Sequence, residues 1–254
     1  MMLDQETLDA ITAGPGPEIH GRTEERMPKM LVMDIETTRM VSLELALEMC
    51  QSSGSFTGNG TAEEDANKYA ATLPPLATIA CVGFADGIKK TALVNCELFG
   101  GAFIEHDIEQ LKDEAAVVTR AFEIIEDSRR WPLVTFSGRM FDLPMLITAA
   151  LRHQIEIPDA VRQLYQENRF RPLNHIDVRE QLTNFGATKG GLRAWCLGLG
   201  LGDPKADGDG SDVARLIAEG KAHQLAEYCL SDCEYTGKLY ARWCLCNGLA
   251  TVPF

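Results

Sequence analysis

The sequence predicts an α/β protein with a mixed β-sheet flanked by helices. Short apolar runs of strand length alternate with longer amphipathic stretches of helical spacing. Hydrophobic residues make up 45% of the 254 residues and charged residues 24%, which excludes a disordered or collagen-like chain. No apolar run approaches the ~18 residues of a membrane span, so we expect no membrane segment.

The first half of the chain predicts the opening strands of the sheet. An apolar run over 30–33 leads into Asp34, Ile35 and Glu36 and is typical of a buried strand, and a second strand is expected over 76–84. Residues 91–99 fit a hairpin partner of that second strand. Between the first two strands we expect a helix over 40–50 and a polar loop or insertion over 51–73.

The second half predicts mainly helices. Apolar residues at helical spacing indicate a long helix over 107–129, and a buried strand follows over 132–136. Further helices are expected over 143–153, 190–200, 211–220 and 222–246. We expect one domain over 28–248, preceded by a polar tail over 1–27 and followed by a short tail over 249–254.

Cysteine usage and charge restrict the functional class. The eight cysteines form no C-x-x-C pair, and residues 1–27 lack the apolar core of a secretory signal, so we expect reduced thiols in a cytoplasmic protein. The net charge of −13 argues against a general nucleic-acid coating protein. Residues 129–205 nevertheless carry a net charge of +4, which would let this part of the chain face an anion.

Two acids stand at the end of the first predicted strand. Asp34 and Glu36 are two residues apart, so both carboxylates point to the same face of the strand. Carboxylates this close repel each other, and a hard divalent cation with oxygen ligands would relieve the repulsion. The alternative is a strand-end loop with two surface acids.

Two further motifs carry acids. Asp142 follows a predicted strand and Gly138, and it would either reach the same centre or cap the helix that contains Pro144. Tyr228 and Asp232 lie four residues apart on a predicted helix and so share one face. The alternative is an ordinary amphipathic helix with a half-buried tyrosine and a solvated aspartate.

In their order along the chain, these motifs resemble the DEDD (DnaQ-like) superfamily of 3′–5′ exonucleases, in its tyrosine-bearing DEDDy subgroup. The chain is most similar to the exonuclease domains of family B DNA polymerases and their stand-alone relatives, over about residues 28–245. The resemblance implies a ribonuclease H-like fold. It also implies hydrolysis of single-stranded DNA from its 3′ end to 5′-mononucleotides. The segments that carry it are 31–37, 134–144 and 228–232.

The resemblance also implies the role of each residue. Asp34 would bridge two divalent ions, Mg²⁺ or Mn²⁺, and Glu36 and Asp232 would complete the site on the nucleophile side. Asp142 would serve the second ion through water. Tyr228 would orient the attacking water, because a phenol with a pKa near ~10 is a poor base at neutral pH.

Other residues are expected around this centre. Ser137 stands where the family commonly has Asn, and Phe141 would stack on a terminal base or belong to the core. His175 and Asp177 are expected to support the metal-binding residues or to serve the fold. The candidates for substrate contact are Thr37, Ser137, Arg139, Phe141 and Lys205, with the arginine and lysine as phosphate contacts or ordinary surface charge.

Two other functions stay open at this point. One is an exoribonuclease acting on short RNA. Proteins distinguish RNA from DNA by contacts to the 2′-hydroxyl, and no motif in the sequence indicates whether such a contact is made. The other is a catalytically silent ribonuclease H-like module that binds nucleic acid or a protein. The pathway is equally open among DNA repair, proofreading in trans and replication of a mobile element. Because the chain outside residues 129–205 is acidic, we expect it to grip only a short stretch of nucleic acid, so that binding is salt-sensitive and weakly processive.

Overall fold

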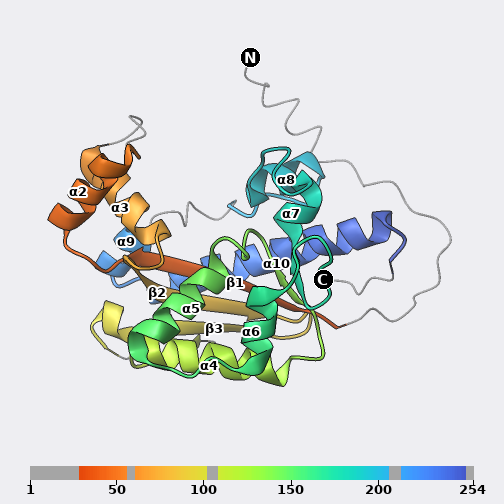
Figure 1. Cartoon of the computed structure of the whole chain (residues 1–254), viewed down its shortest axis with the longest axis horizontal. Coiled ribbons are helices and arrows are strands. Elements are labelled where there is room, and N and C mark those ends of the chain that lie inside the picture. The colour runs from red at the N-terminus through yellow and green to blue at the C-terminus, as the bar shows by residue number, and fades with distance from the viewer. Residues whose placement is uncertain (1–28, 56–60, 102–107, 206–212, 250–254) are drawn as a thin grey trace, which may run out of the picture.

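The computed structural model describes residues 29–55, 61–101, 108–205 and 213–249. Its centre is one six-stranded sheet (Figure 1). The strands are β1 (Leu31–Arg39), β2 (Ala77–Ala85), β3 (Lys90–Asn95), β4 (Ile108–Leu111), β5 (Leu133–Thr135) and β6 (His175–Asp177). Their order across the sheet is β4-β3-β2-β1-β5-β6.

The sheet is mixed. Strand β2 runs antiparallel to both β1 and β3, whereas β4 is parallel to β3. On the other side of β1, β5 and β6 continue the sheet in parallel. A mixed sheet with helices on both faces confirms the predicted α/β class and is consistent with the ribonuclease H-like fold that the resemblance implies.

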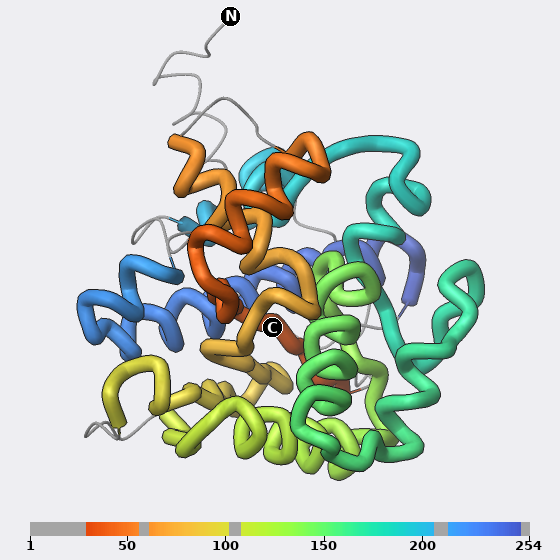
Figure 2. Tube along the Cα trace, turned by 60° about the vertical axis from the view of Figure 1, so that its left-hand side comes forward, coloured from red at the N-terminus to blue at the C-terminus, as the bar shows by residue number. Residues whose placement is uncertain are grey.

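Helices cover both faces of the sheet. They are α2 (Leu43–Ser53), α3 (Ala62–Thr72), α4 (Glu114–Asp127), α5 (Asp142–His153), α6 (Asp159–Gln166), α7 (Val178–Thr183), α8 (Leu192–Gly198), α9 (Val213–Ala218) and α10 (Ala222–Cys246). Figure 2 shows α10 (blue) on one side of the strands and α4 (yellow-green) on the other. None of the helices in the described part of the chain combines the length and the apolar character needed to cross a bilayer.

Side-chain alternation along β1 decides which face receives its acids. Its odd-numbered apolar residues, 31 to 35, pack into the core beneath α4, α5 and α6. Val32 packs into the opposite core, beside α10. Asp34 and Glu36 share the parity of Val32, so their carboxylates lie on the α10 face.

Gly83 explains how closely α10 approaches these acids. It pairs with Asp34 across the β1–β2 ladder. A Cβ atom at Gly83 would lie 2.9 Å from the Cys229 Sγ and 3.2 Å from the Cys229 carbonyl oxygen. Glycine therefore lets α10 lie directly against the sheet, where the Cys229 thiol donates to the carbonyl oxygen of Asp34 at 3.4 Å.

Two predicted elements are wrong in part. The helix expected over 107–129 begins only at Glu114, where Asp113 caps it, and residues 108–111 are strand β4 paired with β3. The polar loop expected over 51–73 contains helix α3, whose first turn closes with a capping box between Thr61 and Glu64. That helix packs on α2 through the small apolar side chains of its Ala66 and Ala70.

Other differences concern short elements and the chain ends. The hairpin partner expected over 91–99 ends as a strand at Asn95 and continues as a 3₁₀ turn, Cys96–Phe99. Helices α6 and α7 were not predicted, because eight and six residues give too little periodicity. The tail expected over 1–27 lies outside the described residues, as does most of the tail expected over 249–254.

Candidate active site

Three carboxylates meet between β1 and α10. Asp34 and Glu36 come from the strand and Asp232 from the helix, and each offers a ligand atom within 4.8 Å of the others. The shared parity of Asp34 and Glu36 and the close approach of α10 produce this cluster. The structure therefore brings together residues that lie almost 200 positions apart in the sequence.

Asp142 joins the same centre from the start of α5. The helix cap is Phe141, without a side-chain cap hydrogen bond, so the interpretation of Asp142 as an N-cap is wrong. The Asp142 side chain is buried, and its Oδ1 atom has no hydrogen-bond partner among the described residues. A buried carboxylate oxygen in this condition is suited to receive a cation or its water.

The electrostatics of the cluster favour a cation. Burial, and then the charge of Asp232, raise the pKa of Asp34 to about 8. Burial likewise raises the pKa of Asp232 to about 6, and it raises the pKa values of Glu36 and Asp142 well above their usual range. Four acids thus lie close together where water solvates them poorly. A hard divalent cation, which prefers oxygen ligands, would relieve the repulsion between their carboxylates. The donor set fits such an ion.

Tyr228 and Lys205 border the cluster. Burial, and then the charge of Asp232, raise the pKa of Tyr228, so its hydroxyl stays protonated and donates to Asp232. The Lys205 ammonium lies 5.6 Å from the centre of the Tyr228 ring, and its charge partly offsets the effect of burial on Asp232. The structure therefore places both predicted residues at the centre.

A tight turn carries Asp142 into place. Asp177 accepts the N–H groups of Ser137 at 3.0 Å and Arg139 at 3.1 Å. A Cβ atom at Gly138 would lie 2.6 Å from the Asp142 Oδ2. Only glycine lets the backbone press this closely against the carboxylate, and Asp177 holds the turn in that position.

The other predicted residues near this turn face inward. The Arg139 guanidinium donates to Glu180 at 3.2 Å and to the carbonyl oxygens of Glu167 and His175. This geometry favours a structural role over the expected phosphate contact. Burial lowers the pKa of His175 to about 3, so its ring is neutral, with Nε2 3.0 Å from the Thr135 hydroxyl.

A cavity of about 670 Å³ opens beside the cluster. Glu36 and Phe141 line it together with Asn67 and Lys68 from α3. The Thr37 hydroxyl donates to the carbonyl oxygen of Ala71 at 2.6 Å, which fastens α3 to β1 at the cavity wall. Phe141 therefore faces a space that falls within the usual size of ligand sites, rather than the core.

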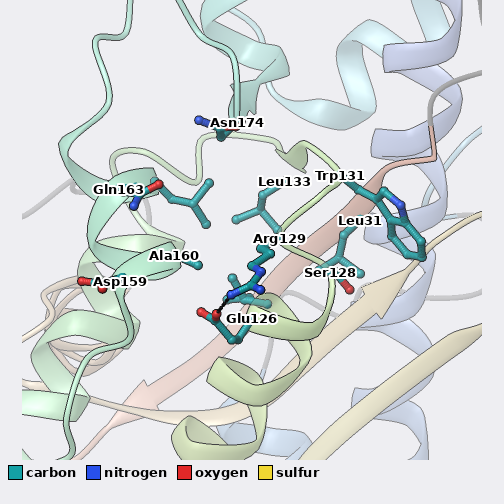
Figure 3. A pocket seen from close by; sticks show the side chains of 12 residues that line it. Leu31, Glu126, Ser128, Arg129, Trp131, Leu133, Asp159, Ala160, Gln163 and Asn174 are labelled. Atoms are coloured by element: carbon teal, nitrogen blue, oxygen red, sulfur yellow. Dashed lines mark hydrogen bonds and ion pairs between the residues drawn. The ribbon is translucent and has the colours of Figure 1, made fainter.

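A second hollow, of about 160 Å³, lies where β1 begins (Figure 3). Trp131 and Leu31 line it, and Arg129 pairs with Glu126 at 2.7 Å. It is much smaller than the cavity beside Glu36. Within the described ranges, the one group of three acids, cysteines or histidines placed to hold a metal is the cluster on β1 and α10.

Comparison with known proteins agrees with this geometry. The model of a family of predicted 3′–5′ exonucleases, related to the exonuclease domain of PolB, matches residues 77–252. The chain belongs to this family. The resemblance to stand-alone relatives of the polymerase exonuclease domains is thereby confirmed. A search of curated proteins finds no significant match.

The family match covers only some of the candidate site residues. Asp142, Tyr228 and Asp232 fall within the matched residues, whereas Asp34 and Glu36 precede them. The sequence predicts all five of these residues at one centre, but it does not predict the cavity wall on α3, because residues 51–73 fit a polar loop. The capping-box pattern of Thr61 and Glu64 was the signal that would have revealed it.

Proposed function

We propose that the protein is a metal-dependent exonuclease that removes 5′-mononucleotides from the 3′ end of single-stranded DNA. The observation that carries this proposal is the Asp34, Glu36 and Asp232 cluster, with ligand atoms within 4.8 Å of one another. Membership in a family of predicted 3′–5′ exonucleases supports the direction and the bond cleaved. The cavity beside Glu36 supports a nucleotide-sized substrate.

The acids suit two divalent ions, Mg²⁺ or Mn²⁺. Asp34, Glu36 and Asp232 would hold one, and Asp142 would share the second with Asp34, whose charge raises the Asp142 pKa next after burial. When bound, such ions neutralise charge on the phosphate and make water a stronger nucleophile at neutral pH. Residues Asp34 and Asp142 approach from different elements, β1 and α5, so they would bind on two sides of one centre.

The remaining side chains position the reactants. The Tyr228 hydroxyl is protonated and points to Asp232, so it orients the attacking water and does not remove its proton. Lys205 offers the positive charge next to Tyr228 to a backbone phosphate. Phe141 presents its ring to the cavity beside Glu36, where the terminal base would stack.

The test is digestion of a 5′-labelled single strand, as DNA and as RNA, with Mg²⁺ or Mn²⁺. We expect a ladder that shortens from the 3′ end of the DNA and disappears in EDTA and in Asp34→Ala. Leu151→Ala is the matched control, because Leu151 is 68% exposed at the far end of α5 and should keep full activity.

The outcomes separate the alternatives. Degradation of RNA alone would replace DNA by RNA as the substrate class. No cleavage of either strand by protein with a native circular dichroism spectrum would reduce the chain to a binding module. Equal cleavage by wild type and Asp34→Ala would show that the acidic cluster is not the catalytic centre.

A further inference from the structure

An aromatic pair lies on the surface beside α7. The rings of Phe170 and Phe185 have centroids 4.7 Å apart and planes tilted by 60°. The Arg169 guanidinium carbon lies 5.7 Å from each ring centroid. Phe170 is 65% exposed, so one face of this arrangement, hereafter the Phe170 platform (Arg169, Phe170 and Phe185), is open to solvent.

The platform is held in a fixed shape. Arg169 pairs with the buried Glu180 at 2.6 Å, and the Asn168 side chain accepts the N–H of Phe170 at 3.0 Å. Phe185 has a φ of 57°, in the left-handed region that bulky residues seldom adopt. Its N–H donates to the Glu180 carbonyl oxygen at 2.8 Å. This left-handed residue follows the C-cap of α7, Asn184, and fixes the half-buried Phe185 ring against Phe170.

One short helix joins the platform to the candidate active site. Glu180 and Arg179 both lie on α7, and the Arg179 guanidinium donates to the Ser137 hydroxyl at 3.3 Å. Asp177, which caps α7, also holds the turn that leads to Asp142. Figures 1 and 2 both show α7 beside the loop that enters α5. The six-residue helix α7 therefore connects the platform to the turn that carries Asp142.

The charges around the platform suit a polyanion. Three basic residues of the same stretch of chain are exposed: Arg171, Arg179 and Lys189. The acids of the same segment turn inward: Glu180 pairs with two arginines, and Glu167 accepts backbone N–H groups of residues 173 to 175. The outer surface is thus basic, in a chain whose net charge is −13. Basic side chains around open aromatic rings form the combination that binds single-stranded nucleic acid.

We propose that the Phe170 platform binds bases of the single strand upstream of the 3′ end, so that the strand is gripped at two places. This inference rests on the proposed exonuclease function. The cavity beside Glu36 would hold the terminal nucleotide, and the platform would stack bases farther from the end. Strands too short to reach the platform would bind only through the terminal site.

The test is a length series. Fluorescence anisotropy would give the Kd of 5′-labelled oligothymidylates of three and twelve nucleotides, with Ca²⁺ as the divalent ion and with the strands verified as intact after each titration. We expect Phe170→Ala to weaken binding of the twelve-nucleotide strand about tenfold or more, the range for loss of one stacked base, and to leave the trinucleotide unchanged. Phe170→Trp should restore the affinity, and Leu151→Ala should match wild type for both strands.

Several results would overturn the proposal. Unchanged binding of the longer strand by Phe170→Ala, or an equal loss for both lengths, would exclude a stacking role. A Phe170→Trp variant no better than Phe170→Ala would show that the ring is structural. Degradation of the same strands by wild type in Mg²⁺ tests the proposed function separately: cleavage without a Phe170 effect refutes the platform alone, and a Phe170 effect without cleavage refutes the exonuclease alone.

Discussion

Substitution of Gly138 by alanine should disable the site while leaving the fold intact. A Cβ atom there would lie 2.3 Å from the Thr135 hydroxyl oxygen, 2.4 Å from the Thr135 Cβ and 2.6 Å from the Asp142 Oδ2. Nonbonded carbon atoms pack at roughly 3.5–4.0 Å, so at least one neighbour must move by about 1 Å. Thr135 Cβ is fixed to the backbone of β5, whereas the Asp142 carboxylate can rotate.

The magnitudes follow from that displacement. Overpacking by one methyl group typically costs about 1–3 kcal/mol of stability. A displacement of about 1 Å in a reacting group can lower the rate by about 10²-fold. Because Asp177 fixes the turn on one side and Thr135 on the other, the strain should be transferred to Asp142. We therefore expect a large loss of rate and a moderate loss of stability.

The assay combines three measurements on Gly138→Ala. These are the initial rate of nucleotide release from a labelled DNA strand, the urea midpoint of unfolding, and the affinity for Mn²⁺ by calorimetric titration. Gly191→Ala is the control, because a Cβ atom at Gly191 meets nothing within 4 Å and its φ is −87°. Wild-type activity and Mn²⁺ affinity in Gly138→Ala would refute the assignment of Asp142 to the centre.

Three further predictions concern stability. Glu114→Gln should lower the free energy of unfolding by about 2–3 kcal/mol, because buried Glu114 binds Arg152 at 2.7 Å. Burial opposes ionisation of Glu114, but hydrogen bonds from the Ile79 N–H, Arg152 and His153 and the charge of Arg152 hold the Glu114 pKa below its usual value. The difference in unfolding free energy between wild type and Glu114→Gln should therefore narrow as the pH falls below about 4. Ser137→Gly should raise the free energy of unfolding by about 0.5–1 kcal/mol, since Ser137 has a φ of 71°, and a lower melting temperature would contradict this. Mn²⁺ at about 100 times its Kd should stabilise wild type by about 2.7 kcal/mol over protein in EDTA, and a thermal shift of equal size in Asp232→Asn would argue against the cluster as the metal site.

The sequence predicted the fold class because buried strands and amphipathic helices leave distinct periods. The predicted elements were wrong where the same residue pattern is compatible with two kinds of secondary structure. Ile108 and Leu111 suit the amphipathic face of a helix, but pairing with β3, a long-range contact, makes them strand β4. Residues 62–72 are polar enough for a loop, and only the capping box and the alanines that pack on α2 make them helix α3.

Prediction of the site depended on how local each feature is. The shared face of Asp34 and Glu36 follows from strand alternation, and that of Tyr228 and Asp232 from helical spacing. The contact between the two pairs depends on Gly83, which admits α10 to the sheet and has no local signature. Contacts between distant segments had to come from the structure.

The family model covers most of the candidate site but not the wall of the cavity beside Glu36. Residues 77–252 match the family model and include Asp142, Tyr228 and Asp232, whereas α3, which lines one wall of the cavity, precedes them. In the proposed mechanism the acids determine which bond is cleaved, and the cavity wall determines what fits against Glu36. We therefore expect the sugar and base that this protein accepts to depend on Asn67 and Lys68 on α3 more than on the acids proposed to bind the metal.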